Sequence, residues 1–436
     1  MQSLIEHVQA ALGGNLGLVL GCVLVGSLVA QMLVMLVSSV RQLAAESNQQ
    51  RFARERMELL VKSAKADWQD KETAKSLWNG LRKFTVAKKI KECDGVYSFH
   101  LAPHDGKPLP LFKPGQYLTF SLDIPGRDKP VVRCYSLSDG PIHPTHYRVT
   151  IKREGPPPDR RELPPGVASS YFSDVLKEGD ILNVKAPTGH FYLDLNKPTP
   201  IVLLGGGIGV TPMLSMAKAV AASGSKREVW FFYGVRSRKE HMLQEEIKNL
   251  AEANDNIRLH VCYSRPDPDD VKGRDYHHAT RVTPELLKEL LPSNNYEYYL
   301  CGAGPFMQTL SEGLETWGVP EKNVHYEAFG PATVVKKQSE PPPSASDTAM
   351  LSRFVVTFAK SNKKCNWNPA AANLLKFAEQ QGVRIDSGCR TGGCGSCVVA
   401  VKNGAFKHTK DPDAPPEAGS CLTCIAKPTG DLVLDA

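Results

Sequence analysis

The sequence predicts a multidomain protein with one transmembrane helix, an antiparallel β-barrel, a doubly wound α/β domain and a small cysteine-rich domain, in that order. Three observations predict this fold class. No Asp, Glu, Lys or Arg occurs between Val8 and Val40. Strand-like runs separated by turn residues follow, and then apolar strands alternate with helical stretches. Six of the eleven cysteines lie in the last 86 residues.

The composition is that of a folded globular protein. The 436 residues suffice for two to four domains of about 100–200 residues each. Hydrophobic residues make up 42% and charged residues 23%, which argues against disorder. The net charge of +7 is spread along the chain without a long basic run, so we expect no nucleic-acid partner. Because the cysteines cluster instead of forming a disulfide framework, the cytoplasm is the expected compartment.

After an N-terminal segment (residues 1–15), residues 16–40 form the predicted transmembrane helix, longer than the roughly 20 residues needed to cross a bilayer. A signal peptide is the poorer interpretation, since residues 1–15 contain no Lys or Arg. Glu6 is the only Asp, Glu, Lys or Arg before the span, whereas Arg41, Arg51, Arg54 and Arg56 follow it. The positive-inside rule then predicts a single-pass protein of the inner (cytoplasmic) membrane with its soluble domains in the cytoplasm. Residues 41–80 resemble a charged helical connector.

Residues 81–198 are predicted to form the β-barrel. Short runs rich in β-branched and aromatic residues are separated by Pro-Gly, Asp-Gly and Gly-Asp turns. The expected strands are Phe84–Ala87, Val96–Phe99, Gln116–Leu122, Tyr147–Lys152 and Ile181–Val184.

Residues 199–330 are predicted to form the α/β domain. Continuous apolar runs, typical of buried parallel strands, occur at Ile201–Leu204, Val229–Tyr233, Ile257–Val261 and Tyr296–Leu300. Helices are expected at Met213–Ala222 and Lys239–Ala253. Residues 331–350 are a Pro- and Ser-rich linker, and residues 351–436 form the last domain, beginning with the strand Phe354–Phe358.

The strongest chemical signal is the spacing C-x4-C-x2-C of Cys389, Cys394 and Cys397. A fourth cysteine follows at Cys424, with Cys421 as a nearby alternative. Four soft thiolates can hold two irons bridged by two sulfides, whereas zinc prefers paired C-x2-C knuckles. Glycines crowd the loop, which lets backbone N–H groups point at the sulfurs. The pattern therefore predicts a [2Fe–2S] cluster.

Two further segments have the chemistry of a flavin site. In Arg133-Cys134-Tyr135-Ser136, Arg can neutralise a pyrophosphate, Tyr can stack on a ring and Ser can bond the flavin N5 region. Gly166, Val167, Ala168, Ser169 and Ser170 stand at an expected helix start, where phosphates bind. The structural alternative is an ordinary strand end followed by a helix cap.

A dinucleotide site is predicted where glycines follow two apolar strands. Gly206, Gly207, Gly209, Thr211 and Pro212 come directly after the first strand of the α/β domain, although the G-x-G-x-x-G fingerprint is absent. A second glycine turn contains Cys301, Gly302, Gly304 and Pro305. Cys301 could be a plain core residue, but its neighbours favour a nicotinamide contact.

Together, these strings resemble the ferredoxin–NADP reductase superfamily over Lys83–Gly330. The chain looks most similar to the reductase half of flavohaemoglobins and to oxygenase reductases with a C-terminal plant-type ferredoxin domain. The resemblance implies a flavin barrel, an NAD domain and a β-grasp-like [2Fe–2S] domain. In plant-type ferredoxins a Leu-Thr-Cys sequence carries the last ligand, which favours Cys424 over Cys421.

Carried over by motif, the resemblance assigns roles to individual residues. Lys152 would line the adenine or pyrophosphate, and Glu327 and Phe329 would close over the flavin ring. The implied catalytic set is Ser136, Cys301, Glu327 and Phe329. The helix start at Gly166 favours FAD over FMN. The loop from Ser264 to Tyr276 favours NADH over NADPH, although Arg236, Arg238 and Arg265 could bind a 2′-phosphate.

The expected function is electron transfer: a hydride passes from NAD(P)H to FAD, and single electrons then pass to the cluster and to a membrane-associated acceptor. That acceptor would be an oxygenase, hydroxylase, desaturase or quinone. The alternatives are a subunit of the NADH:quinone reductase type and a non-catalytic redox sensor. No role follows from the sequence for the proline-rich insertion at residues 155–165.

Overall fold

A computed structural model describes residues 2–11, 19–42, 77–141, 144–156, 164–328, 354–412 and 416–436, together with residues 17, 54, 56–57, 61 and 161–162. The chain divides into two units, Met1–Glu72 and Thr73–Ala436. The first contains α1 (Gln2–Ala11) and an exposed helix at Val19–Gln42. Among the described helices, Val19–Gln42 is long and apolar enough to cross a membrane. Most of the predicted connector lies outside the described residues.

The second unit begins with a six-stranded antiparallel sheet in the order β4-β3-β6-β1-β2-β5. An antiparallel bridge between Leu137 and Val149 joins its two ends, so the sheet closes into the predicted barrel. Its interior is filled by buried aromatic residues such as Phe84, Phe99 and Phe120, each worth about 1.5–3 kcal/mol of burial. The strands are β1 (Arg82–Cys93), β2 (Val96–Pro103), β3 (Tyr117–Leu122), β4 (Val131–Ser136), β5 (Tyr147–Lys152) and β6 (Ile181–Thr188).

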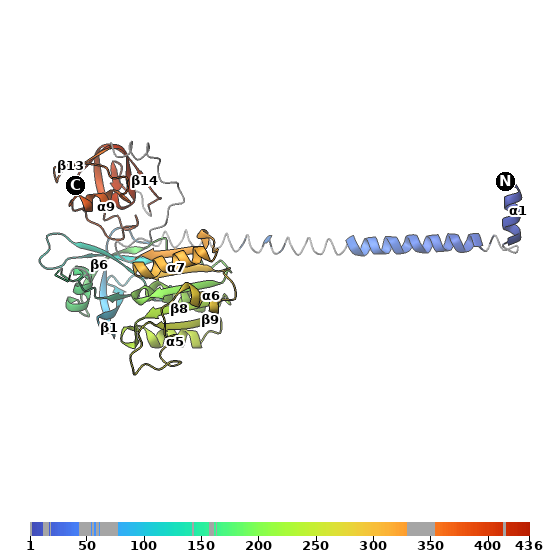
Figure 1. Cartoon of the computed structure of the whole chain (residues 1–436), viewed down its shortest axis with the longest axis horizontal. Coiled ribbons are helices and arrows are strands. Elements are labelled where there is room, and N and C mark those ends of the chain that lie inside the picture. The colour runs from blue at the N-terminus through green and yellow to red at the C-terminus, as the bar shows by residue number, and fades with distance from the viewer. Residues whose placement is uncertain are drawn as a thin grey trace. The chain divides into compact units, whose positions relative to one another are not determined.

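A five-stranded parallel sheet follows in the order β11-β10-β7-β8-β9. Two separate apolar cores cover its two faces, one with α4 and α5 and the other with α6 and α7, as in a doubly wound fold. Figure 1 shows α5 and α7 on opposite sides of the strands. The elements are β7 (Ile201–Gly206), α4 (Val210–Ala222), β8 (Val229–Val235), α5 (Gln244–Glu252), β9 (Ile257–Tyr263), α6 (Pro284–Leu290), β10 (Glu297–Gly302), α7 (Gly304–Thr316) and β11 (Val324–Ala328).

The predicted helix Lys239–Ala253 is wrong in its first half. A short turn at Arg238–Glu240 is separated from α5, because Leu243 adopts a left-handed conformation with φ of 57°. This kink buries both Met242 and Leu243 in the core of the sheet, which a straight helix would not do. Tertiary packing therefore overrides the local helical pattern.

The last domain has a mixed sheet in the order β13-β12-β16-β14-β15. The helix α9 packs Leu374, Phe377 and Ala378 against the sheet residues Val356 and Phe358, as expected for a β-grasp-like domain. The predicted linker at residues 331–350 lies outside the described residues. The elements are β12 (Val355–Phe358), β13 (Lys363–Asn366), α9 (Leu374–Gln380), β14 (Val398–His408), β15 (Ser420–Leu422) and β16 (Ala426–Leu434).

Candidate active site

The two predicted glycine turns of the α/β domain lie beside each other, because β7 and β10 are neighbours and Gly205 pairs with Cys301. Their approach leaves no room for a side chain at Gly209, where a Cβ atom would stand 2.1 Å from the carbonyl oxygen of Cys301. Pro212 lies in the first turn of α4, and Thr211 donates its hydroxyl hydrogen to the carbonyl of Ile208 across 3.0 Å. This is the switch point of the sheet, where dinucleotides bind in such folds.

Three of the four predicted catalytic residues, Ser136, Cys301 and Glu327, lie close together beside this switch point. Glu327 pairs in register with Cys301, and the hydroxyl of Ser136 donates a hydrogen bond of 3.3 Å to Oε2 of Glu327. Burial raises the pKa of Glu327 to about 8 and raises that of Cys301 well above its ordinary value. Both groups are therefore neutral at pH 7 and can donate hydrogen bonds without adding charge. The fourth predicted residue, Phe329, lies outside the described residues.

The predicted flavin segments also come together on the barrel. Tyr135 packs edge-on against Phe172, with ring centroids 5.2 Å apart, and Phe172 lies in the helical turn directly after α3 (Val167–Ser170). The hydroxyl of Ser170 is buried and has no hydrogen-bond partner among the described residues. Because buried polar groups are normally hydrogen-bonded, a bound phosphate would supply the missing partner. Lys152 is the last residue of β5, where it pairs with Val96 of β2. It therefore lies on a different strand of the barrel from Arg133 and Tyr135, which are in β4. These residues fit a bound flavin.

The cysteine loop is built around its sulfurs. The backbone N–H groups of Thr391, Gly393 and Cys394 all donate to Sγ of Cys389, at 3.4, 3.2 and 3.2 Å. Such donors stabilise thiolates and the clusters that thiolates bind. Positive φ angles at Gly392 and Gly395 allow the chain to curl in this way.

The four predicted ligands stand as two pairs. The backbone N–H groups of Cys389 and Cys394 each donate to the Sγ of the other at 3.2 Å, and Cys397 packs with Cys424. No group of three or more metal-ligating side chains close enough to share one metal ion is found among the described residues. Cys421 faces the separate core of the β-grasp sheet, whereas Cys424 packs with Cys397. The donor set therefore fits a [2Fe–2S] cluster.

The cysteine loop also contacts the barrel, although no sequence pattern predicts this contact. Lys185 of β6 donates to the carbonyl of Cys394 across 2.9 Å, and Arg133 donates to the carbonyl of Ser387 across 3.4 Å. The pKa of Cys134, between Arg133 and Tyr135, is raised well above its ordinary value because the thiols of Cys389 and Cys394 lie beside it and because it is buried. The predicted cluster loop is thus next to the predicted flavin strand. No local sequence signal marks Lys185, because its partner lies 209 residues away.

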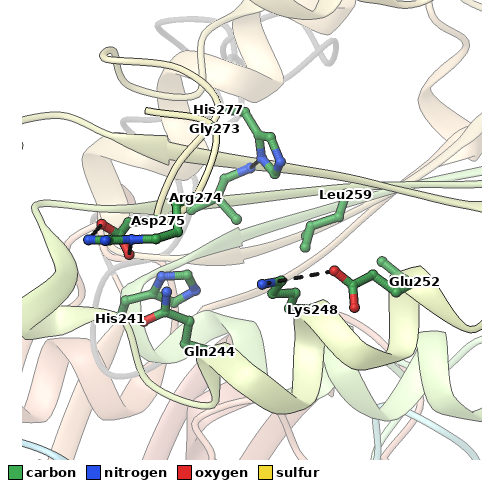
Figure 2. A pocket seen from close by; sticks show the side chains of 11 residues that line it. His241, Gln244, Lys248, Glu252, Leu259, Gly273, Arg274, Asp275 and His277 are labelled. Carbon is green, nitrogen blue, oxygen red and sulfur yellow. Dashed lines mark hydrogen bonds and ion pairs between the residues drawn. The ribbon is translucent and has the colours of Figure 1, made fainter. Parts of the chain in front are cut away.

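A cavity of about 300 Å³ lies elsewhere in the α/β domain, between α5, β9 and the loop at residues 273–277. Figure 2 shows His241 and His277 on its wall, together with the ion pairs Arg274–Asp275 and Lys248–Glu252. None of the predicted site residues lines it. The cavity is therefore separate from the cofactor sites described above.

Comparison with known families covers all three soluble domains. Residues 83–192 match the oxidoreductase FAD-binding domain, residues 203–312 the oxidoreductase NAD-binding domain, and residues 356–429 the 2Fe-2S iron-sulfur cluster binding domain. The chain belongs to the ferredoxin reductase-like oxidoreductases, with a C-terminal 2Fe–2S ferredoxin domain. The predicted family, fold class and cofactors (FAD, a nicotinamide dinucleotide and a [2Fe–2S] cluster) are thereby confirmed. The three matched domains make this reductase an NAD(P)H-dependent flavin and iron–sulfur oxidoreductase.

Individual relatives cover parts of this reductase. The FAD/NAD-binding domain of nitric oxide dioxygenase from Vibrio cholerae is 32% identical, with a TM-score of 0.51, covering 58% of this chain and 100% of that one. A flavohemoprotein of Halalkalibacterium halodurans is 38% identical over 275 residues, which are 63% of this chain and 66% of that protein. The reductase thus spans less than two thirds of that relative. A type IV self-sufficient cytochrome P450 monooxygenase shares the fold over 82% of this chain and 41% of its own, at 23% identity and a TM-score of 0.53.

Proposed function

We propose that this reductase is a membrane-anchored component that supplies electrons to an oxygenase, hydroxylase or desaturase at the cytoplasmic face of the inner membrane. One observation carries this proposal. A helix long and apolar enough to cross a membrane, Val19–Gln42, belongs to the same chain as the NAD, FAD and [2Fe–2S] domains. An anchor raises the effective concentration of the reductase towards any acceptor in the same bilayer.

Each cofactor has its proposed residues in the second unit. Bound FAD supplies the conversion of a hydride pair into single electrons. Ser136 and Glu327 would contact the flavin ring, and Arg133 and Ser170 would bind its phosphates. This assignment is supported by the Ser136–Glu327 hydrogen bond and by the unpartnered hydroxyl of Ser170 within the described residues. The remaining proposed flavin contacts are Tyr135, Lys152, Gly166, Val167, Ala168 and Ser169, with Phe329 on the nicotinamide side.

The nicotinamide and the cluster have separate proposed contacts. The glycine turns at residues 206–212 and 301–305 would bind NAD(P)H, since they lie side by side at the switch point of the sheet. The cluster ligands would be Cys389, Cys394, Cys397 and Cys424. The contact of the cluster loop with Arg133 and Cys134 is consistent with a short path from the flavin.

NADH is the proposed substrate in preference to NADPH. A 2′-phosphate needs free cations, and two of the three candidates are already paired: Arg236 with Glu240 at 3.2 Å and Arg238 with Asp270 at 3.6 Å. We expect kcat/KM to be higher for NADH than for NADPH. A higher value for NADPH would contradict this choice.

The decisive experiment separates the anchor from the electron path. Deleting residues 1–42 should leave NADH–ferricyanide activity unchanged and abolish turnover of the membrane acceptor, identified by co-purification in detergent. An unrelated transmembrane helix fused to the truncated chain is the control and should restore turnover. Equal acceptor turnover with and without the anchor would refute the proposal. Reduction of quinone by the pure protein in liposomes would favour the quinone reductase, and a flavin that NADH does not bleach would favour a sensor.

A further inference from the structure

A partly buried ionic network, centred on Arg148, links the barrel to the α/β domain. Arg148 of β5 is only 6% exposed and binds both carboxylate oxygens of Glu246 in α5, at 2.7 and 3.0 Å. The same guanidinium donates to the hydroxyl of Ser138 at 3.2 Å and to its carbonyl oxygen. Arg148 therefore holds the barrel segment after β4 and α5 of the α/β domain at the same time.

A second cation extends the network. Lys218 of α4 is paired with Glu246 at 2.7 Å and with Asp139 of the barrel. The hydroxyl of Ser215, also in α4, donates to the carbonyl of Asp139 across 2.8 Å. Two cations thus face two carboxylates. Burial by itself would raise the pKa values of Glu246 and Asp139, but Arg148 and Lys218 hold both below their ordinary values.

The network lies next to the predicted reaction site in the chain. Ser138 and Asp139 come two and three residues after Ser136 at the end of β4. Lys218 and Ser215 lie in α4, which begins directly after the glycine turn that ends at Gly209. The ionic network therefore joins the segment that follows the proposed flavin contact Ser136 to the helix that follows the proposed nicotinamide turn.

We propose that Arg148, Glu246, Lys218 and Asp139 are positioning residues that set the separation and angle between the nicotinamide and the flavin. This inference rests on the proposed placement of the flavin at Ser136 and of the nicotinamide at residues 206–212. An apolar contact can slide, whereas a bidentate ion pair fixes both distance and direction. Buried ion pairs add little net stability compared with apolar packing, so geometry is the property that this network supplies.

The test compares two lysines that make ion pairs of the same length. Lys218→Met removes one of the two cations that link the domains. Lys91→Met removes the pair of Lys91 with Asp94, which lies on the surface of the barrel domain and is also 2.7 Å long. We expect anaerobic flavin reduction by NADH to slow by about tenfold or more in Lys218→Met, since small misplacements of reacting groups are costly. The apparent Kd for NADH should stay within twofold, and Lys91→Met should behave as the wild type.

A second readout does not depend on turnover. The charge-transfer absorbance of the holoenzyme with the unreactive analogue 1,4,5,6-tetrahydro-NAD reports ring stacking, and it should weaken in Lys218→Met and in Glu246→Gln. Lys218→Arg keeps the charge and should recover the rate. Unchanged rate and unchanged absorbance in folded Lys218→Met would overturn the inference.

The failure of this inference can be told apart from that of the proposed function. If NADH does not reduce the flavin of the wild type, the proposed flavin and nicotinamide placement fails. If NADH reduces the wild type and Lys218→Met alike, only the positioning role fails. Should Glu246→Gln not fold, Lys218→Met and Lys218→Arg still decide. The carboxylates that lose Lys218, Glu246 and Asp139, have side chains that are 29% and 26% exposed, so no fully buried charge is left behind.

Discussion

The hydroxyl of Ser136 donates a hydrogen bond of 3.3 Å to Oε2 of Glu327, although 191 residues separate them. Ser136 ends strand β4 of the barrel, and Glu327 lies in β11 at the edge of the parallel sheet. The bond therefore joins the FAD-binding and NAD-binding domains at the point where their cofactors are proposed to meet.

Removal of the Ser136 hydroxyl should slow flavin reduction. In Ser136→Ala, Glu327 loses its partner and the proposed flavin contact disappears, so we expect a loss of about tenfold in the rate constant, equivalent to about 1.4 kcal/mol. Stopped-flow measurement of flavin bleaching by NADH checks this, and Ser136→Thr should retain most of the rate. A rate in Ser136→Ala equal to that of the wild type would exclude the contact.

The raised pKa of Glu327 makes stability depend on pH. Glu327 has a pKa of about 8 in the folded chain, against an ordinary value of 4.5. Between pH 4.5 and pH 8 the folded state therefore keeps a proton that the unfolded state has lost. The stability contribution of Glu327 therefore falls as pH rises from 4.5 to 8. The Tm of Glu327→Gln relative to the wild type should rise between pH 5 and pH 8. Glu315→Gln, at an exposed position of α7, is the control, and a Tm difference that stays flat for Glu327→Gln would contradict the expectation.

Two cysteines three residues apart should behave differently. Cys424→Ala should lose the iron and the visible spectrum of the cluster while keeping FAD, because Cys424 packs against Cys397. Cys421→Ala should keep the cluster and lose about 1 kcal/mol of stability, since Cys421 faces the core of the sheet. Iron content, flavin content and thermal unfolding measure both outcomes. Loss of iron in Cys421→Ala alone would reverse the assignment.

The glycine turn offers a pair of matched substitutions. Gly209→Ala places a Cβ 2.1 Å from the carbonyl oxygen of Cys301, and we expect a loss of about 1–3 kcal/mol together with weaker NADH binding. A Cβ at Gly207 would meet nothing within 4 Å, so only its left-handed backbone, with φ of 55°, costs about 1 kcal/mol. Thermal unfolding and NADH titration compare the two. Equal effects would show that the contact with Cys301 is unimportant.

Elements whose signal is local could be predicted from the sequence. Apolar runs such as Ile201–Leu204 identify buried strands, and the cysteine spacing identifies the cluster, because each pattern depends on residues near one another in the chain. The kink at Leu243 could not be predicted, since the burial of Met242 and Leu243 against the finished sheet outweighs local helix propensity. The choice between Cys421 and Cys424 needed the family resemblance, and their different cores in the structure support it.

By itself, the sequence determined the order of the domains, the family and the identity of the three cofactors. Tertiary structure alone decided which side chains meet across domains: Ser136 with Glu327, Lys185 with the backbone of Cys394, and Arg148 with Glu246. In sequence, Arg148 and Glu246 look like ordinary surface charges 98 residues apart. Their pairing depends on the closure of the barrel and on the winding of the parallel sheet. Such long-range contacts leave no periodic or spaced pattern in a single chain.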